Sequence, residues 1–135
     1  MGLEELKRKF IVDEEEEKKR IEGLLQRILR FARVTKEGFV YFERKNLSQI
    51  DRVALVIAAR YLGGLLEESI SQEVNLEEIT IMTGVSKRVA SARVADLSKE
   101  GLVDNVSRGR YRARGLFAVE KILDLLERKY TGGSK

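Results

Sequence analysis

The sequence contains no cysteine and no histidine. Without cysteine there is no disulfide, no thiol nucleophile and no thiolate metal ligand. Without histidine, the commonest general base and the commonest metal ligand are also missing. The chain has no glycine-rich phosphate loop with a lysine, and no plausible pairing of a nucleophile with a base. We therefore expect no enzymatic activity, no cofactor and no bound metal.

Long apolar runs are also missing. No apolar stretch of about 18 residues is present and no signal-peptide pattern is recognisable, so we expect a cytoplasmic protein without a membrane span. The 135 residues fit one domain with an appended element, and 43% apolar residues are enough for a core. Charged residues make up 36%, and with few Asn and Gln they favour a thermophilic source.

The net charge of +4 is unevenly distributed along the chain. The segment from Gly84 to Gly115 holds eight basic and three acidic residues, so it carries +5 and the rest of the chain −1. Within it, the sequence SRGRYRARG (107–115) has an arginine at every second position. Because side chains alternate along a strand, an extended conformation would place Arg108, Arg110, Arg112 and Arg114 on one face. Such a concentration of positive charge is typical of an anion-binding surface.

The first half of the chain predicts helices and one hairpin. Residues 3–12 are expected to form a short helix, and Asp13 is expected to cap a second one that runs to about Arg30. The acidic run at 13–17 is interpreted as its solvated start, because consecutive carboxylates do not converge on a metal. A β-hairpin with a turn at Gly38 is expected within 34–46, its aromatic residues packing on a neighbouring helix. Ser48 should begin a helix that ends between 62 and 67, followed by a loop with at most one short strand. The apolar stripe expected for that helix comprises Ile50, Val53, Ala54, Ile57, Tyr61 and Leu65.

The second half predicts two short helices and another hairpin. Asn75 and Glu78 have the spacing of a capping box, and the helix they begin should stop at Gly84. Ser86 should cap the next helix, at 87–99, and Gly101 should end it. This helix is expected to bury Ala90, Val94 and Leu97. A hairpin with Gly109 in its turn should follow.

This succession of elements carries a family resemblance. The segment LEEITIMTGVSKRVASARVADLSKEGLV (76–103) resembles the helix-turn-helix of winged-helix DNA-binding domains, and DNVSRGRYRARG (104–115) resembles their wing. The resemblance spans about 47–115 and is particularly close to the small regulators of archaea. It implies a fold that is mainly α with a small β-part (α+β), in which a winged helix-turn-helix core has appended N-terminal and C-terminal helices. The expected division is an N-terminal helical extension at 1–33, a hairpin and linker at 34–46, the core at 47–115, a C-terminal helix at 116–131 and a disordered tail at 132–135.

The resemblance implies binding to double-stranded DNA, most simply as a transcriptional regulator. Helix 87–99 would enter the major groove, and the wing would contact the phosphate backbone. The implied DNA-binding residues are Ser86, Lys87, Arg88, Ser91, Ala92, Arg93, Arg108, Arg110, Arg112 and Arg114. Ala92 and Ala95 stand where related proteins often have long polar side chains, so we expect phosphate contacts to dominate and sequence preference to be modest.

Two alternatives stay open for the basic surface. The arginine row could be a solvated strand face paired with the acidic residues at 13–17, although surface ion pairs contribute little. The domain could also be an interaction module within a larger assembly, with its basic face on an acidic protein or on RNA.

The last helix, 116–130, has an apolar seam with heptad spacing. This seam could cover the apolar face of the N-terminal helix in the same chain, or the two faces could meet across a dimer axis. We expect a homodimer, because both helices are appended to a domain with its own core. The residues expected to dimerise are Leu116, Val119, Ile122, Leu123, Leu126 and Tyr130 in the last helix, with Ile21, Leu24, Leu25 and Ile28 in the N-terminal one.

Overall fold

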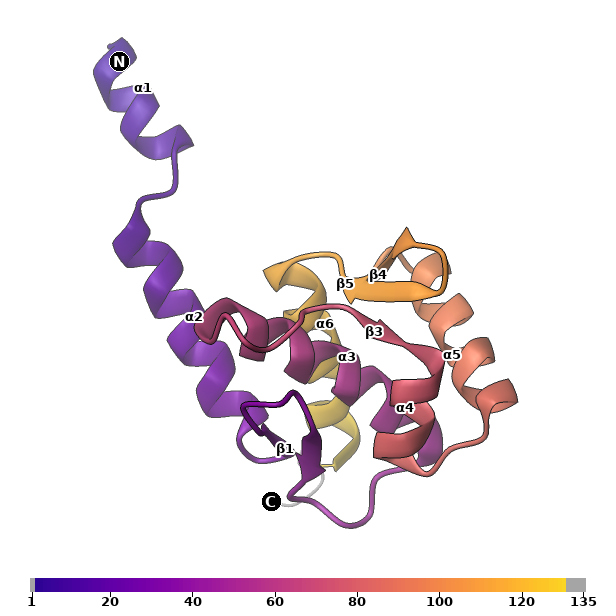
Figure 1. Cartoon of the computed structure of the whole chain (residues 1–135). Coiled ribbons are helices and arrows are strands. Elements are labelled where there is room, and N and C mark those ends of the chain that lie inside the picture. The colour runs from indigo at the N-terminus through magenta and orange to yellow at the C-terminus, as the bar shows by residue number, and fades with distance from the viewer. Residues whose placement is uncertain (1, 131–135) are drawn as a thin grey trace.

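A computed structural model describes residues 2–130, and Figure 1 shows their arrangement. The chain is mainly α-helical with two small antiparallel sheets, as expected for an α+β protein. Its elements in chain order are α1 (Leu3–Phe10), α2 (Glu14–Ile28), β1 (Ala32–Val34), β2 (Val40–Phe42), α3 (Gln49–Leu66), β3 (Val74–Asn75), α4 (Leu76–Thr83), α5 (Lys87–Lys99), β4 (Val103–Ser107), β5 (Arg110–Ala113) and α6 (Leu116–Tyr130). The expected tail at 132–135 lies outside the described residues.

The predicted helix starts are confirmed by their caps. Asp13 accepts a hydrogen bond from the backbone N–H of the third residue of α2, and Ser48 and Ser86 do the same for α3 and α5. Asn75 and Glu78 form both bonds of a capping box at the start of α4. Each cap satisfies a backbone N–H that has no partner inside its helix, which fixes where the helix begins.

Helix α3 is the centre of the fold, and α2, α4, α5, α6, β1, β2 and β5 all contact it. Its side chains are buried almost all round from Val53 to Leu62, as in a helix enclosed by a core. The single apolar stripe predicted for it is therefore wrong at both ends. Ile50 is 44% exposed and Leu65 is 41% exposed, because both lie near helix termini that the other elements leave uncovered.

The first hairpin, β1–β2, packs on the helices with one face, so the expectation that its aromatic residues pack there holds for Phe42 and is wrong for Tyr41, which is 57% exposed. Val40 is buried, Phe42 contacts the core, and the backbone N–H of Val40 donates to Sδ of Met82 on α4 at 3.3 Å. The alternate residues Phe39 and Tyr41 point outward, with ring centroids 5.2 Å apart. One face of this hairpin therefore belongs to the core and the other is solvated.

The α2 and α6 apolar faces meet within one chain, which corrects the expected dimer surface. Arg27 on α2 spans the joint, because its guanidinium donates to Asp124 at 2.7 Å and to both carboxylate oxygens of Glu127 at 2.8 and 2.9 Å. The hydrogen bonds from Arg27 to Glu127 hold the pKa of the guanidinium above its ordinary value. The residues expected to dimerise are buried or half-buried here: Leu24, Ile28, Val119, Ile122, Leu123 and Leu126 are buried, and Ile21, Leu25, Leu116 and Tyr130 are half-buried. The two stripes therefore pack on each other within the chain, which was the open alternative, and Leu25 remains partly exposed.

Helix α1 stands apart from this body. It buries none of its residues, and in Figure 1 it projects away beyond the N-terminal end of α2. No helix within residues 2–130 is long and apolar enough to cross a membrane.

Candidate nucleic-acid interface

The turn between α4 and α5 is fixed by local contacts. Gly84 ends α4 in the left-handed conformation, with φ of +74°. The Thr83 hydroxyl donates to the carbonyl of Ile79 at 2.6 Å and accepts from the N–H of Val85 at 3.1 Å. Val85 itself is fully buried, so it anchors the turn in the core. These contacts set the direction in which α5 leaves the turn.

Helix α5 has one apolar and one open face, as the sequence predicts. Ala90, Val94 and Leu97 are buried, and their side chains join the core around α3. The opposite face is exposed along its length and includes Ser86, Lys87, Arg88, Ser91, Ala92, Ala95, Asp96 and Lys99. Neither Lys87 nor Arg88 forms an ion pair with any side chain of residues 2–130. The start of α5 therefore presents two uncompensated positive charges.

Arg93 lies away from that open face. It is half-buried and lines a shallow groove with Asp51 and Lys129, between α5 and the last turns of α6. Its Nε is buried without a hydrogen-bond partner among the described residues. Arg93 was expected to bind DNA, but the structure places it away from the other residues of α5 that were expected to do so.

The hairpin β4–β5 follows α5 and contacts its C-terminal part through β4. Strand β5 is the central strand of the sheet β3–β5–β4, so both of its edges are hydrogen-bonded. Ala113 is buried and Tyr111 packs on the core, which places Arg110 and Arg112 on the opposite, outer face. Arg108 departs from the predicted row, because it lies in the turn and the register shifts between Asn105 and Ser107.

Ion pairs neutralise half of the arginine row. Arg110 pairs with Glu73 at 2.8 Å and Arg114 pairs with Asp104 at 2.7 Å. Arg108 and Arg112 form no ion pair within residues 2–130. The alternative in which the row pairs with the acidic residues at 13–17 is wrong, because the partners lie beside the sheet.

Arg60 positions the segment that carries one of these partners, and the sequence analysis missed it. Its side chain, 5% exposed, reaches from α3 to the chain preceding β3. Arg60 donates to the carbonyls of Ser71 at 2.7 Å and Glu73 at 2.8 Å, and also to the carbonyl of Gly38 at 3.2 Å and the carboxylate of Glu78 at 3.3 Å. A signal was present, because an arginine in the apolar run of α3 must find buried acceptors.

A second polar cluster joins the end of α6 to the start of α3. The Tyr130 hydroxyl donates to Asp51 at 2.5 Å and accepts from the N–H of Ser48 at 2.9 Å, and Lys129 pairs with Asp51 at 2.9 Å. Burial raises the pKa of Asp51, but the hydrogen bonds from Tyr130, Lys129 and Ser48 outweigh it, so the pKa lies below its ordinary value. This cluster closes one end of the groove that holds Arg93.

Comparisons with protein-family models, with curated proteins and with solved structures gave no match for this chain. Within residues 2–130, no group of three or more acidic side chains lies close enough together to hold a metal ion.

Proposed function

We propose that the protein is a winged helix-turn-helix protein that binds double-stranded DNA, most simply as a transcriptional regulator. The observation that carries the proposal is a set of basic residues on α5 and on the hairpin that follows it, which form no ion pair within residues 2–130: the exposed Lys87, Arg88 and Arg108 and the half-buried Arg112. The order α3, β3, α4, α5, β4, β5 and the sheet order β3–β5–β4 support the winged-helix interpretation. In it, α5 enters the major groove and the hairpin lies on the backbone.

Phosphate is the ligand that suits the hairpin best. A guanidinium is always charged and pairs bidentately with phosphate oxygens. Arg108 and Arg112 have no competing carboxylate within hydrogen-bonding distance, so a phosphate meets them without breaking an existing ion pair. Arg110 and Arg114 would first have to leave Glu73 and Asp104. We therefore expect the two unpaired arginines to contribute more to binding than the two paired ones.

Sequence preference should be modest. Ala92 and Ala95 lie at the middle of the exposed face of α5, at positions where a longer polar side chain could form two hydrogen bonds with a base. Alanine contacts a thymine methyl but donates no hydrogen bond. Arg88 is the residue of this face best suited to read a guanine.

The test is fluorescence anisotropy of a random-sequence duplex of about 30 base pairs, titrated with the protein at several salt concentrations. We expect log K to fall steeply with log salt, and the double variant R108A/R112A to reduce that slope by about two units, since each lost phosphate contact removes about 0.9. The variant R110A/R114A should change the slope less.

The matched control is K18A/K19A, which removes the same charge from an exposed part of α2. An equal change of slope in this control would mean that the net charge and not the hairpin governs binding. Binding of duplex RNA as strong as that of duplex DNA would contradict insertion of α5 into a major groove, because the major groove of A-form RNA is too narrow. Weak binding of both at low salt would favour the interaction-module alternative.

A further inference from the structure

Helix α1 presents an apolar face that no other residue within 2–130 covers. Leu3, Leu6 and Phe10 are spaced i, i+3, i+7, and they are 80%, 49% and 83% exposed. Ile11 and Val12 extend the same apolar surface past the end of the helix and are 56% and 62% exposed. A run of exposed apolar residues this dense is typical of a surface that contacts another molecule.

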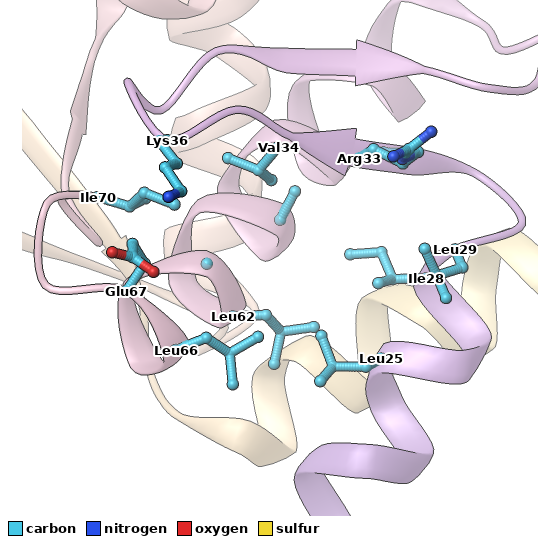
Figure 2. Close-up of a pocket in the computed structure, with 13 residues that line it drawn as sticks. Leu25, Ile28, Leu29, Arg33, Val34, Lys36, Leu62, Leu66, Glu67 and Ile70 are labelled. Carbon is cyan, nitrogen blue, oxygen red and sulfur yellow. The ribbon is translucent and has the colours of Figure 1, made fainter.

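The body of the protein carries an open apolar groove. It lies between the C-terminal half of α2, strand β1 and the C-terminal end of α3, and it has a volume of about 400 Å³. This is within the range of about 300–1,000 Å³ that is usual for ligand pockets. Figure 2 shows that Leu25 and Leu29 line one side and that Leu62 and Leu66 approach them from α3. Leu29 and Leu66 are 56% and 58% exposed, so the groove is open to a large partner.

The charges around the groove are complementary to those of α1. Arg33 and Lys36 lie on one side of the groove and Glu67 lies near Lys36. Helix α1 has Glu4 and Glu5 in its first turn and basic residues in its last turn. None of the side chains of Glu4, Glu5, Arg33, Lys36 and Glu67 forms an ion pair within residues 2–130. A helix seated in the groove would therefore find partners of both signs.

The helix is poorly placed to fill its own groove. Residues 11–13 connect α1 to α2, and the four Cα–Cα steps from Phe10 to Glu14 span about 14 Å at most. Two packed helices need an axis separation of about 8–10 Å, which uses most of that reach. Folded back, α1 would lie beside the first half of α2, whereas the groove begins at Leu25, about 16 Å along α2 from Glu14.

We infer that α1 docks into this groove on a second copy of the chain. The groove then receives Leu3, Leu6 and Phe10 as the anchors of a helix-in-groove contact. Two copies exchange their α1 helices reciprocally around a two-fold axis, so each copy supplies one helix and one groove. The homodimer expected from the sequence forms in this way mainly through α1 and the groove, and of the residues expected to dimerise only Leu25 and Ile28 line that groove.

The test is the oligomeric state of the full chain by sedimentation over a concentration series, without nucleic acid, so its result is independent of the proposed DNA binding. The helix variant L6E/F10E removes two apolar anchors from α1, and the groove variant L29E/L66E removes two from the groove. Each should weaken dimerisation by at least about 100-fold, because both copies of the helix-in-groove contact are then lost. The control I81E changes an isoleucine on α4 that is 68% exposed and lies outside both surfaces, and it should dimerise like the wild type.

Mixing the two variants separates this exchange from other dimers. The helix variant keeps its groove and the groove variant keeps α1, so an equimolar mixture should recover a heterodimer held by one intact contact. A groove variant that dimerises as well as the wild type would show pairing of α1 with α1 and would overturn the inference. A monomeric wild type at all concentrations would overturn it as well. Melting curves of all variants check that the changes at exposed sites leave the fold intact.

Discussion

Replacing Arg60 by methionine removes four hydrogen bonds near the centre of the molecule while keeping most of the side-chain volume. The guanidinium joins α3 to the first hairpin at Gly38, to α4 at Glu78 and to the chain before β3 at Ser71 and Glu73. Gly38 is far in the sequence from the other three partners, and all four are brought together around this one side chain. The substitution therefore tests whether this one residue holds the periphery to α3.

The four bonds do not contribute equally. The carbonyl of Glu73 keeps a partner, because it also accepts from the Ser71 hydroxyl, and Ser71 is exposed to water. The carbonyl of Gly38 has no such substitute and lies in a buried position. A hydrogen bond with a charged donor contributes about 1.5–3 kcal/mol, and removal of the buried cation returns part of its desolvation cost. We expect a net loss of about 3 kcal/mol in the free energy of unfolding.

The assay is urea unfolding followed by circular dichroism, with thermal melting as a second readout. A loss of about 3 kcal/mol corresponds to a fall of about 10 °C in Tm for a domain of this size. The matched control is R52M on the same helix, because Arg52 is half-buried and its side chain forms no hydrogen bond within residues 2–130. A loss below about 1 kcal/mol in R60M, or an equal loss in both variants, would refute the reasoning.

Two further predictions concern a pair of glycines and the buried aspartate. Gly64→Ala should destabilise the protein by about 1–3 kcal/mol, since the added Cβ would lie 3.0 and 3.1 Å from backbone atoms of Ile70 and Gln72. Gly23→Ala should instead stabilise the protein by up to about 1 kcal/mol, because the Cβ added there meets nothing within 4 Å. Stabilisation by Gly64→Ala in urea unfolding would contradict this. Asp51→Asn should be less stable than the wild type at neutral pH, and the difference should shrink as the pH falls below the ordinary pKa of 3.8, because the lowered pKa makes the charged form stabilising. A difference that does not change with pH, measured by unfolding at several pH values, would exclude a role for the charge.

The sequence predicts those features that depend on neighbouring residues. The caps at Asn75 and Ser86, the end of α4 at Gly84 and the three-residue inner face of α5 follow from spacings of two to seven positions, and the structure confirms them. Such local signals act through backbone hydrogen bonds and helix geometry, which need no knowledge of the rest of the fold.

The features that the sequence could not predict depend on distant partners. Periodicity shows that the α2 and α6 stripes must be buried, but not whether they meet in one chain or in two. The deciding contacts join Arg27 to residues about a hundred positions away. The charge of the arginine row also depends on a distant partner. Alternation along the strand predicts which face the arginines share, but the neutralisation of Arg110 depends on Glu73, which is 37 positions away. For Arg60, its place in an apolar run signals that it needs buried acceptors, but the identity of those acceptors depends on distant segments.

The ion pairs beside β5 also affect how the surface binds. Arg110 holds the hairpin to the chain before β3, and Arg114 holds the end of β5 to β4 within the hairpin, before any ligand arrives. Because both edges of β5 are already hydrogen-bonded, binding need not order this hairpin and loses little conformational entropy. The surface is therefore preorganised, and a ligand should meet it with a small change in heat capacity, unlike a segment that folds as it binds.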